Sequence, residues 1–394
     1  MCGHSRPLAV AVLLVLTACQ QDLQSPTQAD PEAPLAEAAA APPFQHLSAG
    51  IFHTCGVATD GRAYCWGTNP NGGLGDGTFE DRLQPTPVAG GLLFRQVSVG
   101  DGFSCGVTTD DLAYCWGWGF DGILGNGSTE DSPVPVAVLG GRRFRGVTSG
   151  GSHTCGVSSS GAAFCWGNNA YGQLGDGTDR SRRHPVKVSG GDFRQLSTGT
   201  FHSCGIGGDG RAYCWGNNTG GQLGDGSRDN RAVPTAVKGN RSWLDIDAGL
   251  LHTCAVATTN AAYCWGFNDE GQLGIGSRGA SQIRAVPKLV LGGKSFRQVT
   301  LGGGYSCGLT TSGEGWCWGG NTSGQLGDGS ATPRLSPARV SGSRHWTLLV
   351  AGFDQTCGVA VNGRGWCWGD NLFGELGNGT TNPSAVPVQV VAPM

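Results

Sequence analysis

Short runs in which apolar and polar residues alternate recur along most of the chain, and they predict β-strands. A representative unit contains four of them, FRQVSVG (94–100), SCGVTTD (104–110), LAYCWG (112–117) and SPVPVAV (132–138), separated by turns rich in Gly and Asp. No long segment has the 3.6-residue apolar period of an amphipathic helix. Each unit therefore predicts a four-stranded antiparallel sheet.

This unit recurs seven times along the chain. Two cysteines ten residues apart mark each copy, and the first cysteine of the pair recurs every 49 to 53 residues. The pairs are Cys55 with Cys65, Cys105 with Cys115, Cys155 with Cys165, Cys204 with Cys214, Cys254 with Cys264, Cys307 with Cys317, and Cys357 with Cys367. A fixed period of this length with four strands per repeat is typical of propeller blades. We therefore predict an all-β fold, a seven-bladed β-propeller of four-stranded antiparallel blades, over residues 44–394.

The cysteine spacing predicts one disulfide in every blade. Cys55 and Cys65 are symmetric about Asp60, so a three-residue loop with Gly61 in the left-handed conformation places them directly opposite each other. Opposed residues in a non-hydrogen-bonded pair have Cα atoms about 4.5–5.5 Å apart, within reach of a disulfide. Neither zinc binding nor redox catalysis is favoured, because the chain has no Cys-x-x-Cys spacing and all seven pairs look alike.

The first residues predict export and a lipid anchor. Arg6 precedes an apolar run, residues 8–16, that is too short to span a bilayer and is typical of a signal peptide over residues 1–18. LTAC (16–19) resembles the lipobox of bacterial lipoproteins, which predicts a lipid on Cys19 and attachment to the outer membrane or cell surface. Ordinary cleavage nearby is the alternative. Residues 19–43 are rich in Pro, Ala and Gln and predict a tether.

Composition and charge narrow the range of partners. The chain has 71 Gly, 19 Pro and only 2 Met, which agrees with a turn-rich all-β protein. Omitting Arg6 from the 26 basic residues, and the four acids of residues 19–43 from the 29 acidic ones, leaves 25 of each in residues 44–394. A formally neutral domain lacks the cationic surplus that phosphate binding requires, so we expect no nucleic acid partner.

The repeat resembles one known family. Each copy is close to HTCGVSSSGAAFCWGNNAYGQLGDGT, the sequence at 153–178. It is similar to the repeat of the regulator of chromosome condensation family, which implies a seven-bladed β-propeller over residues 44–391. The family's founding member is a nuclear exchange factor for a small GTPase and binds nucleosomes. An exported, neutral chain without a large insertion favours another role, and the secreted bacterial β-lactamase inhibitory propeller, which binds its target protein through loops on one face, is the closer parallel.

Two repeated polar positions resemble metal ligands but favour structural roles. The residue two places before the first cysteine is His53, His153, His202 or His252 in four copies, and Phe103, Tyr305 or Gln355 in the others. Because Phe cannot bind a metal, hydrogen bonding or packing between blades is favoured. The turns of Asp76, Asp176, Asp225 and Asp328 miss the spacing of known calcium loops. We predict no metal and no cofactor.

Antiparallel strand order places the long third-to-fourth loops and the first-to-second connections on one face, which we call the long-loop face. Its loops differ most between repeats and are the candidates for recognition. The predicted binding residues are the aromatic Trp118, Phe120, Tyr171, Phe267 and Phe373 and the basic Arg180, Arg182, Arg183, Arg228 and Arg231. Aromatic side chains anchor protein interfaces, and the arginines form a local positive patch suited to an acidic partner.

These observations predict a surface-tethered, monomeric and non-enzymatic scaffold that binds another protein through the long-loop face. A carbohydrate or cell-wall binding module that uses the same aromatic residues is the alternative. A hydrolase would need paired carboxylates that interrupt the repeat, and Glu270 and Glu375 do not form a recognisable pair. The alternative interpretation of the candidate residues is structural: the rings pack under their own loops, and the arginines pair with Asp179 and Asp229.

Overall fold

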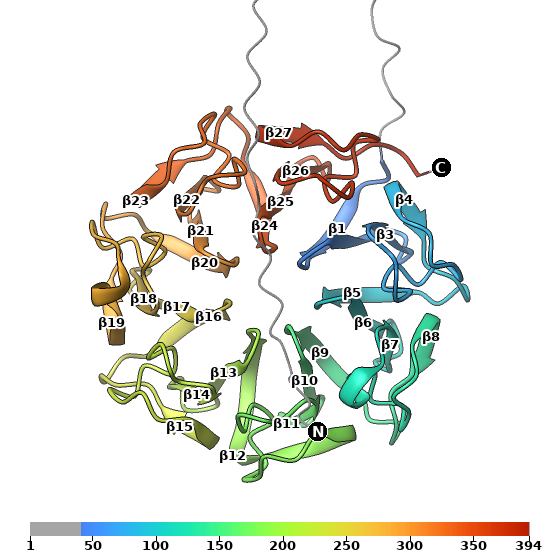
Figure 1. The fold of residues 1–394 in the computed structure, drawn as a ribbon, viewed down its shortest axis with the longest axis horizontal. Coiled ribbons are helices and arrows are strands. Elements are labelled where there is room, and N and C mark those ends of the chain that lie inside the picture. Colours follow the sequence, from blue (N-terminus) through green and yellow to red (C-terminus); the bar gives the residue numbers. More distant parts are fainter. Residues whose placement is uncertain (1–40, 394) are drawn as a thin grey trace, which may run out of the picture. The chain divides into compact units, whose positions relative to one another are not determined.

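The strands of each repeat form one blade, and the seven blades are arranged in a ring (Figure 1). The computed structural model describes residues 41–393, so the predicted signal peptide (1–18), the lipidation site Cys19 and most of the tether (19–43) lie outside the described residues. Within every blade, consecutive strands pair antiparallel in chain order, from an inner strand at the channel to an outer strand at the rim.

The first four blades have the following strands. Blade 1 contains β1 (Phe44–Ala49), β2 (His53–Ala58), β3 (Ala63–Gly67) and β4 (Arg82–Pro87). Blade 2 contains β5 (Phe94–Val99), β6 (Phe103–Thr108), β7 (Ala113–Gly117) and β8 (Ser132–Ala137), with a short 3₁₀ helix, η1 (Phe120–Gly122), in its long loop. Blade 3 contains β9 (Phe144–Ser149), β10 (His153–Ser158), β11 (Ala162–Gly167) and the start of β12 (Arg182–Thr198). Blade 4 contains the end of β12, β13 (His202–Gly207), β14 (Ala212–Gly216) and β15 (Arg231–Ala236).

Three further blades complete the ring. Blade 5 contains β16 (Trp243–Ala248), β17 (His252–Ala257), β18 (Ala262–Gly266) and β19 (Arg284–Leu289), with η2 (Ala280–Gln282) in its long loop. Blade 6 contains β20 (Phe296–Leu301), β21 (Tyr305–Thr310), β22 (Gly315–Gly319) and β23 (Arg334–Arg339). Blade 7 contains β24 (Trp346–Ala351), β25 (Gln355–Ala360), β26 (Gly365–Gly369) and β27 (Ser384–Gln389). Strand β12 is continuous across two blades, and the blade 3 and 4 strands therefore form one seven-stranded sheet.

The central hairpin of each blade is closed by a disulfide, as the cysteine spacing predicts. The bonded cysteines lie directly opposite each other in the strand register, and their Cα atoms are 4.0–4.1 Å apart in all seven blades. The bonds join Cys55 to Cys65, Cys105 to Cys115, Cys155 to Cys165, Cys204 to Cys214, Cys254 to Cys264, Cys307 to Cys317, and Cys357 to Cys367. In blade 1 the hairpin loop has three residues and ends at Gly61, whose φ of 85° is accessible to glycine without strain. Seven disulfides indicate an oxidising compartment.

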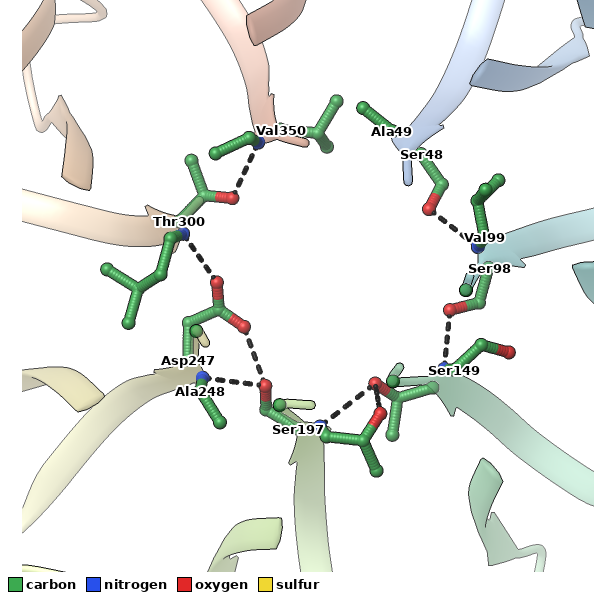
Figure 2. A pocket seen from close by; sticks show the side chains of 18 of the residues that line it. Ser48, Ala49, Ser98, Val99, Ser149, Ser197, Asp247, Ala248, Thr300 and Val350 are labelled. Atoms are coloured by element: carbon green, nitrogen blue, oxygen red, sulfur yellow. Dashed lines mark hydrogen bonds between the residues drawn. The ribbon is translucent and has the colours of Figure 1, made fainter. Parts of the chain in front are cut away.

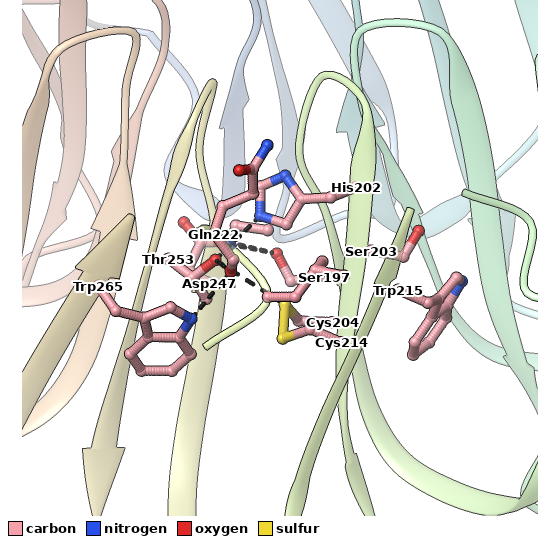
Figure 3. The surroundings of a disulfide bond; sticks show 12 residues. Ser197, His202, Ser203, Cys204, Cys214, Trp215, Gln222, Asp247, Thr253 and Trp265 are labelled. Carbon is pink, nitrogen blue, oxygen red and sulfur yellow. Dashed lines mark hydrogen bonds between the residues drawn. A yellow bond between two sulfur atoms is a disulfide. The ribbon is translucent and has the colours of Figure 1, made fainter. Parts of the chain in front are cut away.

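Adjacent blades are joined by a buried hydrogen-bond network that involves the repeated His and Trp (Figure 3). His202 Nε2 lies 2.9 Å from Thr253 Oγ1, and that hydroxyl donates to the Gln222 carbonyl at 2.8 Å. Because the single hydroxyl proton is already used, the imidazole must donate through Nε2. Trp265 Nε1 donates to the same carbonyl. Burial lowers the pKa of His202 to about 3, so the ring is neutral and structural, as predicted.

The ring closes by packing between blades 7 and 1, and within residues 41–393 no strand is shared between these two blades. β1 pairs with β2, and β27 pairs with β26. Across the junction, the Phe44 N–H donates to the Gly363 carbonyl at 2.8 Å, and Trp66 Nε1 donates to the Glu375 carbonyl at 2.8 Å. These contacts repeat those between other blades, so blades 7 and 1 meet as two consecutive repeats do.

The predicted separation of loops between two faces is confirmed. The Thr68 N–H, after β3, donates to the Phe52 carbonyl in the β1–β2 connection, so these segments share the long-loop face. The Phe94 N–H, in the return between blades, donates to the Gly61 carbonyl in the cysteine hairpin. We call the face formed by these hairpin loops and returns the hairpin face. The long-loop face therefore contains seven pairs of loops, and the hairpin face contains seven hairpin loops and six returns.

Candidate functional site

A channel with a volume of about 540 Å³ runs along the ring axis and is lined by the inner strands of all seven blades. The next-to-last residue of each inner strand lies at the junction with the next blade around this channel (Figure 2). In six blades this side chain accepts a hydrogen bond from the last inner-strand N–H of the next blade, over 2.8–3.3 Å. The six residues are Ser48, Ser98, Thr148, Ser197, Asp247 and Thr300.

Blade 7 departs from this pattern because its equivalent residue is Val350. Its side chain has no oxygen, so it provides no acceptor at the junction with Ala49 of blade 1, and Figure 2 shows the hydrogen-bonded chain interrupted there. The sequence contained the signal, because in five of the seven blades a Ser or Thr lies two residues before the glycine that follows the inner strand. It was missed because the position is also compatible with ordinary strand residues.

Blade 5 contributes two carboxylates to the channel wall. Asp247 accepts from Ser197 Oγ at 2.6 Å and from the Leu301 N–H at 2.8 Å. Asp245 accepts from Gln195 Nε2 and from the Val299 N–H, both at 2.8 Å. Burial raises the pKa of Asp247 to about 7, and the neighbouring negative charge of Asp245 adds to the shift. All four oxygens have donors from this chain, so the pair joins blades 4, 5 and 6.

The long-loop face has three pairs of aromatic rings, and each pair includes at least one predicted residue. Trp118 stacks on Phe120, with ring centroids 5.3 Å apart and planes at 12°. Tyr171 makes an edge contact with Phe201, and Phe373 makes one with Phe52; the ring centroids are 5.5 Å apart in both pairs. Phe120 is 57% exposed, Tyr171 and Phe373 are each 40% exposed and Phe52 is 42% exposed. The rings therefore pack in pairs while large parts of them stay exposed to solvent.

Phe201 and Phe52 were not predicted, and both lie in first-to-second connections. Each meets the long loop of the preceding blade around the ring, so the pairs lie at the junctions of blades 3 with 4 and 7 with 1. Other repeats have Gly102, Ser152 and Asp354 at this position. The presence of Phe there in blades 1 and 4 was therefore the available sequence signal. The remaining predicted ring, Phe267, is partly buried and packs over Gly220 of blade 4.

Two of the predicted arginines are bound within their own loops. Arg182 pairs with Asp176 at 2.8 Å, and Arg231 pairs with Asp225 at 2.9 Å. Both aspartates also accept from the hydroxyl and N–H groups two residues later, which gives the turn role predicted for them. Arg228 donates to the Thr219 carbonyl. Arg180 and Arg183 are exposed, so the positive patch is smaller than the sequence predicts.

The loop that presents Phe373 contains a buried acid where other blades have an amide. Glu375 is 1% exposed, and its Oε2 accepts from the Phe373 N–H at 2.9 Å. Blades 3 to 6 have Gln at this position, and Gln173 also donates from Nε2 to Asn168 Oδ1. Blade 7 has Asp370 in place of that asparagine. Burial, with smaller contributions from neighbouring acids including Asp370, raises the pKa of Glu375 to about 7.

These features define a disulfide-closed, seven-bladed propeller with variable loops on one face. The RCC1-like domain model matches residues 17–357, so the chain belongs to the RCC1-like domain family. This confirms the resemblance to the regulator of chromosome condensation repeat. No curated protein sequence matches the chain significantly.

Solved structures of proteins from several organisms have a similar fold. Human WBSCR16 is 21% identical with a TM-score of 0.75, covering 84% of this chain and 96% of that one. Prp20p from Saccharomyces cerevisiae is 19% identical with a TM-score of 0.74, covering 90% and 87%. The CRINKLY WD40 ectodomain of the Arabidopsis thaliana receptor kinase ACR4 is 20% identical with a TM-score of 0.53, covering 88% and 98%. At these identities the likeness shows the fold alone.

The described residues also give information about the compartment in which the protein resides. The seven disulfides favour an oxidising, extracellular environment. Across residues 41–393, no helix has the length and hydropathy required to cross a bilayer.

Proposed function

We propose that this protein is a non-enzymatic scaffold, held at the cell surface by a lipid on Cys19, that binds another protein through its long-loop face. The observation that carries the proposal is the set of three half-exposed aromatic pairs on one face of a rigid ring. Exposed rings cost hydration free energy, and protein interfaces concentrate aromatic residues at their energetic centres. The surface attachment rests on the sequence of residues 1–43.

The arrangement of the rings supports a protein partner. Each pair has one ring fixed against another, so little side-chain entropy is lost when a partner binds. The pairs belong to blade 2 and to the junctions of blades 3 with 4 and 7 with 1, so a partner that contacts all three must span a large part of the face. A similar fold forms the ectodomain of a plant receptor kinase, which agrees with a role outside the cell.

A sugar ligand is less favoured by the geometry of Trp118. Sugar rings stack on exposed aromatic faces, and one face of this indole is covered by Phe120 at a near-parallel angle of 12°. Carbohydrate binding is therefore retained only as an outcome of the test below.

The proposal is tested by affinity capture from envelope extract and secreted fractions, using oxidised residues 41–394. The test variant combines Phe120→Ala, Tyr171→Ala and Phe373→Ala. Trp118 is left in place because it packs on the core of blade 2. We expect a protein that is retained by the wild type and lost by the variant, and identification of that protein with a binding constant completes the test.

The matched control is Val361→Ala, which removes a 69% exposed apolar side chain from the hairpin face. It should leave capture unchanged. If the triple variant retains every captured protein, or Val361→Ala loses the same protein, the long-loop face is not the binding surface. If no protein is captured and a glycan array gives binding that the triple variant lacks, the carbohydrate function replaces the proposed one.

A further inference from the structure

Four blades cover an aromatic ring on the hairpin face with a cation of their own. The ring belongs to the residue before the second cysteine, and the cation lies two residues before the first aromatic residue of the inner strand. The pairs are Arg142 over Phe164 at 4.6 Å, Arg241 over Tyr263 at 4.4 Å, Lys294 over Trp316 at 3.9 Å and Arg344 over Trp366 at 3.7 Å. These distances are those of favourable cation–π contacts.

The cation is absent from the other three blades. Blades 1 and 2 have Pro42 and Leu92 at its position, whereas blade 4 has only a glycine. The ring of blade 4 is Tyr213, which makes an edge contact with Phe193 at 6.2 Å and 86°. The equivalent contact in blade 3, Phe144 with Phe164, has 6.3 Å and 89°, so the two rings are oriented alike. The return between blades 3 and 4 is one residue shorter than its equivalents, and Gly191 lies at the position of the cation.

The blade 4 ring borders a pocket instead. Gly190, Asp192, Phe193, Gly207, Gly208, Asp209 and Tyr213 line a cavity of about 270 Å³, which we call the blade-4 aromatic pocket. A Cβ added to Gly207 would lie 3.1 Å from Tyr213 Cε2, whereas Gly191 and Gly208 have no atom within 4 Å of theirs. Blades 1, 5 and 7 have Ala58, Ala257 and Ala360 at the Gly207 position. Glycines therefore leave the space beside this ring open.

Two carboxylates border the same pocket. Tyr213 donates its hydroxyl to Asp209 Oδ2 at 2.8 Å, which holds that acid at the edge of the ring. Asp192 lines the pocket from the shortened return. Neither acid forms an ion pair with any of residues 41–393. The nearby Arg211 is directed to Asn240 of the next return. The pocket thus combines an aromatic surface with negative charge, and no cation from residues 41–393 covers its ring.

We propose that the blade-4 aromatic pocket binds a lysine or arginine side chain of a partner protein. The partner's cation would lie over Tyr213, between the carboxylates of Asp192 and Asp209. Blades 3, 5, 6 and 7 have a cation of this chain over the equivalent ring. The occupant follows from the four blades in which a cation covers the equivalent ring, two of which have the same edge contact to the inner-strand aromatic residue, and from the charge of the pocket. The site is on the opposite face from the proposed aromatic interface, so either proposal can fail alone.

The test is an NMR titration of oxidised protein with ring-labelled tyrosine, which gives few signals because the chain has 6 Tyr. The probe is the peptide acetyl-Gly-Lys-Gly-amide. We expect a saturable shift of the Tyr213 ring signals and little change at the other tyrosines. The same peptide with Nε-acetyl-lysine, which has no charge, should bind about tenfold more weakly, equivalent to about 1.4 kcal/mol.

Two variants separate this site from general surface binding. Insertion of one Arg between Gly191 and Asp192 gives this return the length and the cation of the returns into blades 3, 5, 6 and 7, and it should abolish the shift. Arg241→Ala is the matched control: it uncovers Tyr263 in blade 5, where Ala257, Ser242 and Thr259 stand in place of Gly207, Asp192 and Asp209, and it should give no saturable shift at that ring. The proposal is overturned if Tyr213 does not respond to the lysine peptide, if the acetylated peptide binds equally well, or if the insertion variant binds like the wild type while its other tyrosine signals show an intact fold.

Discussion

The carboxylate of Asp247 makes the stability of the ring depend on pH. Its pKa is raised to about 7, while an unfolded chain leaves it near 3.8. Between these values the native state holds a proton that the unfolded state has lost, so stability falls as pH rises from about 4 to 7 and changes little above that. Asp247→Ser restores the residue found in three other blades and keeps an acceptor for the Leu301 N–H.

The magnitude follows from the size of the shift. A change of about three pKa units corresponds to about 4 kcal/mol at pH 8. The side chain borders the channel, where water relieves part of the cost, so we expect about 2 kcal/mol. With an unfolding entropy of about 2.1 cal/mol/K per residue over about 350 residues, this is about 3 °C in Tm. Asp247→Ser should therefore melt about 3 °C above wild type at pH 8 and at about the wild-type temperature near pH 3.5.

The assay is thermal unfolding of the oxidised protein, followed by circular dichroism across this pH range. Ser98→Ala is the control, because it removes the acceptor for the Ser149 N–H without changing a titratable group. It should lower Tm equally at all pH values. Parallel Tm curves for wild type and Asp247→Ser would show that channel water solvates the carboxylate fully, and the argument from burial would then be wrong.

Three further changes test other parts of the ring. Replacing Cys204 and Cys214 with Ser should lower the free energy of unfolding by about 2–3 kcal/mol in guanidinium titrations, because the closed loop is short; an unchanged midpoint contradicts this. Val350→Thr supplies the missing acceptor between blades 7 and 1 and should add about 0.5–1 kcal/mol, whereas a lower Tm would show that the hydroxyl cannot reach its donor. Glu375→Gln removes a carboxylate whose pKa is raised to about 7, so Tm should rise at pH 8 but not near pH 4, where the acid is protonated in both the native and the unfolded state. An equal rise at both pH values would contradict the ionisation argument.

The features that could be predicted from the sequence are those that all seven repeats share. The constant spacing of Cys55 and Cys65 determines their register, because a one-residue shift would bring Trp66 opposite Cys55. The faces follow from antiparallel order alone. The hydroxyls of the channel were equally periodic, yet a Ser or Thr in a strand has several explanations, and only the arrangement of blades around an axis shows that Ser98 meets the Ser149 N–H.

Candidate binding residues were harder to predict because exposure depends on the neighbouring blade. Phe120 and Tyr171 are exposed as predicted, but their ring partners could not all be identified from sequence. Phe201 meets Tyr171 only because adjacent blades bring two different loops together. Similarly, Arg182 and Asp176 are six residues apart in a loop whose conformation the repeat pattern does not specify, so their ion pair was not foreseen.

In a repeat protein, the most informative positions for function include those where a copy departs from a role that several others show. Gly191 is an ordinary residue in a Gly-rich return. It becomes informative once Arg142, Arg241 and their equivalents are seen to cover the same ring in four other blades. The shared interaction defines what blade 4 lacks, and the open pocket beside Tyr213 shows that no other side chain of the described residues has replaced it. A role for blade 4 in binding is therefore inferred from a comparison that the molecule itself contains.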